Sequence, residues 1–212
     1  MVTSGDRGAQ TVPGRAGMKG LFVAEIVWAL QEGDVDVAVH SAKDLPAADP
    51  DGVVVAAVPE RADPFDVLVT REPSLQAGAV VGTSSIRRQA QLRRFRPELR
   101  VRDLRGNVDT RLAKLDAGEV DGLVLAAAGL SRLGVTPANA TPMPLDEMVP
   151  APGQGALAVQ ARADDAETIE VVGRLDHTRS RLAYEAERAA GEVAETLLAG
   201  GAARILAEAR GR

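Results

Sequence analysis

The sequence contains no cysteine among its 212 residues. This absence excludes disulfides, thiolate metal ligands and every thiol-based reaction. Aromatic residues make up only 2% of the chain, so we expect a core built mainly of valine, leucine and alanine. No stretch approaches the ~18 apolar residues that a membrane span needs. Residues 1–20 are polar and glycine-rich, without the apolar run of a signal peptide, so we expect a cytoplasmic protein with no membrane partner.

Positive charge is concentrated in one segment of an otherwise acidic chain. Between Arg87 and Arg111 there are nine arginines and three acids, a net charge of +6, whereas the whole chain carries −5. Such a local basic field favours a ligand with several carboxylates or phosphates. The alternative is a solvent-exposed face in an arginine-rich chain. Nucleic acid is the least favoured partner, because Phe95 is the only aromatic residue in this window and bases need stacking platforms.

Short valine-rich runs alternate with longer helical patterns along the chain. The expected strands are 35–39, 53–58, 67–69, 79–81, 123–127 and 156–160. The expected helices are 19–32, 85–95, 108–117, 179–190 and 202–210. This alternation predicts an α/β fold with mainly parallel sheets and helices on their faces.

An internal repeat predicts two lobes of similar build. Residues 30–39 are matched by residues 115–124, and in both copies a glycine is followed by an acid, Val and Asp. Gly33 and Gly118 each suit the left-handed position that ends a helix. Proline-rich breaks then mark where the chain crosses between lobes. The expected lobes are 1–59 with 155–175, which is discontinuous, and 60–154.

The segment from Val80 to Arg88 predicts a strand, a tight turn and the start of a helix. Ser84 and Ser85 would supply hydroxyl and backbone N–H groups at the helix N-terminus, where anions bind. Arg87 and Arg88 fall in the first turn, where the helix dipole disfavours a cation by ~0.3–1 kcal/mol. We therefore expect an anion close to these two arginines.

The segment from Leu104 to Arg111 repeats this arrangement. Arg105 ends a strand, Gly106 allows the backbone to turn, and Arg111 lies one turn into the next helix. Two helix starts bearing arginine could hold separate carboxylates of one molecule through bidentate pairs. Asn107 could join them, and an ordinary helix cap is the alternative for this residue.

A Lys43–Asp44 pair follows the first copy of the repeated strand. The carboxyl end of a strand is a suitable place for a catalytic acid or a group that stabilises a cation. A charged pair on a surface loop is the alternative. His40 is expected to be a structural hydrogen-bonding residue. Because His177 is the only other histidine and is distant in sequence, we expect no metal site.

Six motifs, in this order, resemble those of the porphobilinogen deaminase (hydroxymethylbilane synthase) family. They are Lys19–Phe22, Val39–Pro46, Val81–Gln89, Leu104–Leu112, Ala128–Leu133 and Pro152–Ala156. The resemblance implies two lobes like those of periplasmic binding proteins, followed by a third α/β domain. It also implies the head-to-tail condensation of four porphobilinogens into hydroxymethylbilane (preuroporphyrinogen), with loss of ammonia, and a dipyrromethane cofactor bound to a cysteine. Members of this family are usually monomeric.

The resemblance also implies roles for individual residues. Asp44 would be the catalytic carboxylate, with Lys43 beside it. The residues expected to bind the cofactor are Ser84, Ser85, Arg87, Arg88, Arg105, Asn107 and Arg111. The residues expected to bind substrate are Lys19, Phe22 and Arg132. The partners would be porphobilinogen and the polypyrrole intermediates.

The chain departs from the family pattern in two places. From the resemblance we expect the N-terminal strand and most of the third domain to be absent, with residues 176–212 as a remnant of that domain, and no cysteine is present to anchor dipyrromethane. Two functions therefore stay open: the family's condensation reaction in tetrapyrrole biosynthesis, and an inactive relic or two-lobed binding module for pyrrole carboxylates. The missing pieces would expose sheet edges, so self-association is also expected.

Overall fold

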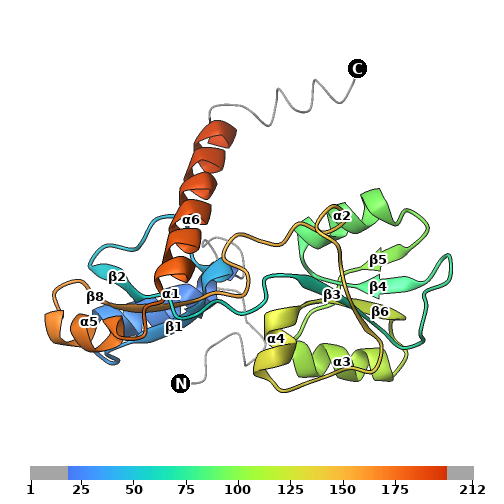
Figure 1. The fold of residues 1–212 in the computed structure, drawn as a ribbon, viewed down its shortest axis with the longest axis horizontal. Coiled ribbons are helices and arrows are strands. Elements are labelled where there is room, and N and C mark those ends of the chain that lie inside the picture. Colours follow the sequence, from blue (N-terminus) through green and yellow to red (C-terminus); the bar gives the residue numbers. More distant parts are fainter. Residues whose placement is uncertain (1–18, 200–212) are drawn as a thin grey trace. The chain divides into compact units, whose positions relative to one another are not determined.

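The computed structural model describes residues 19–199, and its side chains are described from Val23 to Thr196 with the exception of Glu195. Two compact units can be separated, each with its own sheet (Figure 1). The first unit comprises the chain up to Arg61 and from Ala156 onward, and the second comprises Ala62–Gly155. The expected helix at 202–210 lies outside the described residues.

The first unit is built on a three-stranded sheet in which the last strand lies in the middle. Its elements are α1 (Lys19–Gln31), β1 (Ala38–Ser41), a 3-10 turn (Ala42–Asp44), β2 (Val53–Ala57), β8 (Leu157–Arg162), α5 (Ala166–Gly173) and α6 (Thr178–Ala199). The strand order is β1-β8-β2, and β8 is antiparallel to both neighbours. Apolar residues of α1, including Val27 and Leu30, pack against Ala38 and Val53 of the sheet.

The second unit is a five-stranded sheet with helices on both faces. Its elements are β3 (Asp66–Thr70), β4 (Val80–Gly82), α2 (Ile86–Phe95), β5 (Arg100–Arg102), α3 (Val108–Asp116), β6 (Gly122–Ala126), α4 (Ala127–Arg132) and β7 (Ala140–Pro142). Figure 1 shows α2 on one side of the sheet and α3 and α4 on the other. Side chains alternate accordingly along β6, because Leu123 and Leu125 belong to one core cluster and Val124 to the other.

The α/β class is confirmed, but the expectation of mainly parallel sheets is wrong. In the order β5-β4-β6-β3-β7, only the pairs of β4 with β5 and with β6 are parallel. The antiparallel pairs come from the strands next to the points where the chain passes between the two units. The chain enters the second unit through β3, which is antiparallel to β6, and returns through β8, which is antiparallel to β1 and β2. Both sheets are therefore mixed or antiparallel.

Several element boundaries also differ from those expected. The first strand begins at Ala38 rather than at residue 35, because the preceding residues form the turn after α1. The helix expected at 179–190 extends to Ala199 as α6. Within residues 19–199, no helix has both the length and the apolar character required to cross a membrane. The same part of the chain contains no cluster of three or more His, Asp or Glu side chains suited to a metal ion.

Candidate functional site

One edge of the second unit's sheet brings the predicted cationic segments together. Strands β4, β5 and β6 are parallel, so their carboxyl ends lie at the same edge. Strand β3 runs the other way, and its first residue, Asp66, pairs with Ala126 at the end of β6. The loops after β4 and β5 therefore meet Asp66 at this edge, which we call the arginine edge.

Asp66 is the centre of a buried ionic cluster at the arginine edge. Its carboxylate is fully buried and accepts hydrogen bonds from Arg87 Nη2 and Arg88 Nη2, each at 2.7 Å. Gln154 Nε2 donates to the same carboxylate at 2.8 Å. Burial raises the pKa of Asp66, but the hydrogen bonds and charges of Arg88 and Arg87 outweigh it and hold that pKa below its usual value. Asp66 is therefore held as a carboxylate.

This cluster changes the interpretation of Arg87 and Arg88. An anion was expected beside these two cations, and the chain itself supplies one. Arg88 is 6% exposed and also donates from Nη1 to the carbonyl of Val124 at 3.0 Å. Arg87 also donates to the carbonyl of Val149. Both guanidinium groups thus have structural partners, and their role in holding a cofactor stays a prediction.

Among the described residues no ion pair involves Arg111, and Arg88 is close enough for its positive charge to act on Arg111. Its Nη2 reaches Ser84 Oγ at 3.4 Å, which joins the loops after β4 and β5. Burial and the positive charge of Arg88 lower the pKa of Arg111, and the negative charge of Asp103 opposes them. The Nε donors of both arginines are buried and have no hydrogen-bond partner in the described part of the chain. Two neighbouring cations with unused donors form a place where a bound anion would be stabilised.

The other predicted cofactor-binding residues have simpler surroundings. Asn107 is the N-cap of α3, since its Oδ1 accepts from the backbone N–H of Thr110 at 2.9 Å. Its alternative role as an ordinary cap is therefore present in the structure. Arg105 is exposed and donates from Nε to Asp103 at 3.2 Å. Ser85 is the N-cap of α2 without a side-chain capping bond, so its hydroxyl does not cap this helix.

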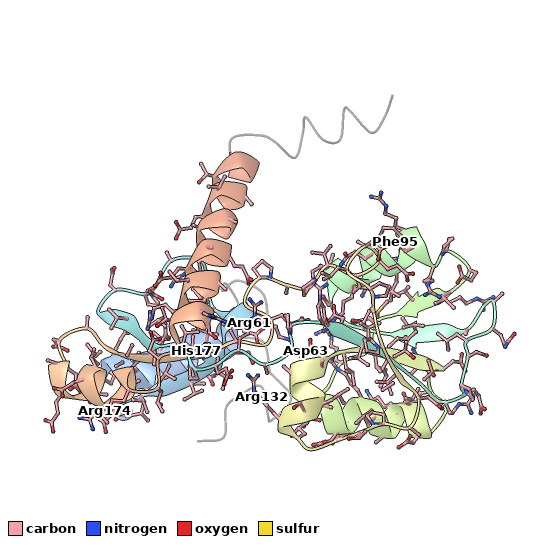
Figure 2. All side chains as sticks on the ribbon, viewed as in Figure 1. Arg61, Asp63, Phe95, Arg132, Arg174 and His177 are labelled. Carbon is pink, nitrogen blue, oxygen red and sulfur yellow. The ribbon has the colours of Figure 1, made fainter. Side chains whose placement is uncertain are left out.

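Arg132, predicted to bind substrate, ends α4 in the second unit. Figure 2 shows its side chain projecting from the end of that helix. Its Nη2 donates to the carbonyl of Gly155 at 2.7 Å. Gly155 has a φ of +85°, and its carbonyl also accepts from the N–H of Ala62 at 3.1 Å. Arg132 thus braces the two segments at which the chain enters and leaves this unit.

The predicted catalytic pair lies in the first unit. Lys43 and Asp44 are half-buried in the 3-10 turn that follows β1. His40, in strand β1, is 6% exposed. Burial lowers the pKa of His40, whereas the negative charge of Asp44 and contact with Gln160 raise it. The side chains of Lys19 and Phe22 lie outside the described residues, so their proposed contacts with substrate stay predictions.

The sequence patterns assigned no role to two residues of the ionic cluster, Asp66 and Gln154. Asp66 is the only acid in its valine-rich strand, and a charge at the start of a buried strand is the signal that could have identified it. Gln154 belongs to the motif Pro152–Ala156, which was noted without a role for this glutamine. Its Nε2 also donates to the carbonyl of Pro64 at 2.6 Å.

The sequence comparisons all point to one family. Residues 1–170 match the sequence model described as porphobilinogen deaminase, dipyromethane cofactor binding domain. The porphobilinogen deaminase of Brevibacillus brevis is 46% identical over 192 residues, and that of Desulforudis audaxviator is 50% identical over 190 residues. These alignments cover 89% and 88% of the chain but 62% of each relative. A solved structure of the methionine binding protein MetQ is similar with a TM-score of 0.49 and 17% identity, covering 78% of the chain and 79% of MetQ.

Proposed function

Because the chain belongs to the porphobilinogen deaminase family, we propose that it acts in tetrapyrrole biosynthesis by binding the carboxylate side chains of linear pyrroles. The proposed binding site is the arginine edge of the second unit. Linear pyrroles of this pathway carry an acetate and a propionate on each ring. A guanidinium group matches a carboxylate through two parallel hydrogen bonds, so several arginines suit such a ligand.

The observation that carries this proposal is the pair formed by Arg88 and Arg111. Arg88 is committed on one side to Asp66, whereas Arg111 contacts only the hydroxyl of Ser84 among the hydrogen bonds described for its side chain. Each keeps a buried Nε donor without a partner. A ligand carboxylate would reduce the repulsion between these cations and would give Arg111 the anion that Arg88 already has.

We extend the proposal to the acidic loop of the first unit. Asp44 would accept hydrogen bonds from pyrrole N–H groups and stabilise the cation that remains when ammonia departs. Lys43, beside it in the same turn, would contribute positive charge toward the ligand's acid groups. Both residues follow the carboxyl end of β1, where side chains are held by a regular element but remain partly accessible.

The residues present fit the dipyrromethane cofactor only in part. The arginine edge offers cations for its carboxylates, but none of the 212 residues is a cysteine, so no thioether can form within this chain. The chain also spans about three fifths of the length of its relatives. We therefore propose that this chain binds linear pyrroles without covalent attachment.

A binding experiment tests the proposal directly. Isothermal titration with a stable dipyrromethane bearing acetate and propionate groups is expected to show saturable binding to the wild-type chain. Arg111→Ala should lower the affinity about tenfold, which corresponds to the loss of one charge-assisted contact. Arg93→Ala is the matched control, because Arg93 lies on the same basic segment and its only side-chain hydrogen bond among the described residues is to Gln89 at 3.3 Å. Equal affinities for wild type and Arg111→Ala would refute the site.

Incubation with porphobilinogen separates binding from turnover. Without a cysteine, we expect neither a uroporphyrin-forming product nor a mass increase of two pyrrole units. Either product would instead support the family's condensation reaction in this chain, with Asp44 as its catalytic carboxylate.

A further inference from the structure

Helix α6 of the first unit contacts the loop that carries Lys43 and Asp44 from two sides. Tyr184 and Arg188 are one helical turn apart, so they share the face of α6 that points at this loop. The ring of Tyr184 is 3% exposed and packs in one core cluster with Ala42, the residue directly before Lys43. The loop thus packs against an aromatic ring that comes from a distant part of the chain.

Arg188 fastens the other end of the same loop. Its Nε donates to the carbonyl of Ala47 at 2.6 Å, and its Nη1 donates to Asp49 at 3.1 Å. The same Nη1 donates to the hydroxyl of Tyr184 at 3.2 Å, and the guanidinium lies 5.4 Å from the centre of the tyrosine ring. Asp49 in turn accepts from Gln160 of β8 at 3.4 Å. These contacts fix the backbone on both sides of Lys43 and Asp44.

Further contacts hold α6 itself on the first unit. Ser180 Oγ accepts from the backbone N–H of Arg61 at 2.8 Å, and Glu187 pairs with the Arg61 side chain at 2.6 Å. Arg181 donates to the carbonyl of Ala56 at 3.0 Å and to Asp176 at 2.8 Å. The helix is therefore anchored independently of the loop and can serve as its support.

We propose that Tyr184 and Arg188 are positioning residues, which hold the Lys43–Asp44 turn in the geometry needed for contact with a pyrrole ligand. We call the contacts of Tyr184 and Arg188 with the loop the clamp. The role of the turn in ligand contact rests on the proposed function, but the effect of the clamp on the loop can be measured without any ligand. A salt bridge on a surface helix would need only one partner. Arg188 instead joins a backbone carbonyl, a carboxylate and a buried hydroxyl, and all but the hydroxyl belong to the loop.

Amide hydrogen exchange of residues 43–49 tests the clamp in the full chain. Arg188→Ala is expected to raise the exchange rate of this loop roughly tenfold over wild type, beyond any change in global unfolding. The reason is that one charged hydrogen-bonding group is lost. Arg188→Lys keeps a cation but cannot donate to Ala47 and Asp49 at once. Its loop exchange rate is expected to lie between those of wild type and Arg188→Ala. Tyr184→Phe removes only the hydroxyl and should produce a smaller increase.

Two variants of the same helix serve as controls. Arg181→Ala removes contacts with Asp176 and β2, so it should lower the melting temperature without a selective change in residues 43–49. Arg179→Ala removes an exposed arginine for which the structure gives no side-chain contact, and should change neither quantity. Loop exchange that is equal in Arg188→Ala and wild type, or equally accelerated in Arg181→Ala, would overturn the inference.

Titration with the dipyrromethane probe separates this inference from the proposed function. We expect Arg188→Ala to weaken binding severalfold, in parallel with its effect on loop exchange. If Arg111→Ala and Arg188→Ala both leave the affinity unchanged while exchange accelerates only in Arg188→Ala, the clamp stands and the proposed function fails. If Arg111→Ala weakens binding and Arg188→Ala alters neither affinity nor exchange, only the clamp is refuted.

Discussion

Asp66 Oδ1 and Arg88 Nη2 are 2.7 Å apart in the interior of the second unit, where the aspartate is fully buried. The pair joins the first residue of β3 to the first turn of α2, two elements that are not adjacent in the sequence. A buried carboxylate is tolerated only when it is paired and hydrogen-bonded, and Arg87 and Gln154 complete its partners. This pair fixes α2 on the sheet and thereby places the arginine edge.

Arg88→Ala is expected to destabilise the chain by about 3 kcal/mol, the lower end of the range for breaking a buried ion pair, because Arg87 still pairs with Asp66. Guanidinium denaturation should show this as a lower midpoint. Arg93→Ala, which removes an exposed arginine of the same helix, should change the free energy of unfolding by less than about 0.5 kcal/mol. A similar stability for wild type and Arg88→Ala would mean that the pair is not needed for folding.

Arg111→Gln is expected to weaken the binding of linear pyrroles while leaving the free protein equally stable or up to about 1 kcal/mol more stable. The reason is that Arg111 is partly buried beside Arg88, and its lowered pKa reflects both effects. Urea denaturation of the ligand-free protein measures its stability, and calorimetric titration measures its affinity for linear pyrroles. A marked loss of stability would show that Arg111 serves the fold rather than a ligand.

Stability should fall below pH 6.5 because of His40. Burial lowers its pKa from 6.5, so just below pH 6.5 His40 is protonated more in the unfolded chain than in the folded chain. The free energy of unfolding is therefore not reduced by His40 above pH 6.5. It declines as the pH falls toward the lowered pKa, with a slope of at most about 1.4 kcal/mol per pH unit. Denaturation between pH 5 and pH 8 measures this slope.

His177→Gln provides the control for that titration, because His177 is the chain's only other histidine. The slope between pH 5 and pH 6.5 should remain in His177→Gln and disappear in His40→Gln. Asp66 acts in a lower range, since its pKa is held below 3.8. Its contribution is present above about pH 4 and is lost only as the pH falls further. A slope that survives in His40→Gln would contradict the assignment.

Gly155→Ala is expected to destabilise the second unit by roughly 2–4 kcal/mol. An added Cβ would lie 2.3 Å from the carbonyl oxygen of Ala62, and the backbone φ of +85° disfavours any other residue. Gly191→Ala is the matched control, because Gly191 lies within α6 and a Cβ there meets nothing within 4 Å. This second change should raise the melting temperature slightly, since alanine stabilises a helix by about 0.5–1 kcal/mol relative to glycine.

The sequence predicted the elements that carry a clear hydrophobic pattern. Strand β6 was expected at 123–127 and lies at Gly122–Ala126, because its fully buried residues form one apolar run. Strand β5 was missed, since Arg100 and Arg102 flank a single valine and its position at the sheet edge leaves both arginines in water. A three-residue edge strand has too few buried side chains to produce a pattern.

The sequence predicted the cationic residues of the candidate site, but it did not predict the buried carboxylate of Asp66. The positions of Arg87 and Arg88 in a first helical turn required a negative charge, and this requirement was correct. Its source, Asp66, lies 22 residues before Arg88 in another element, and only the antiparallel placement of β3 brings it there. Local sequence patterns do not encode this placement, because strand direction depends on where the chain enters the unit.

The central position of β8 has a consequence for how the chain acquires its structure. Among the described strands, β1 and β2 pair only with β8, so this pairing can form only after residues 157–162 emerge, later than the whole second unit. The contiguous unit can thus form first on the ribosome, whereas the described sheet of the discontinuous unit is completed only when β8 joins β1 and β2. Chaperone demand during translation is therefore expected to concentrate on residues 38–57, and insertion of β8 is the step that ends it.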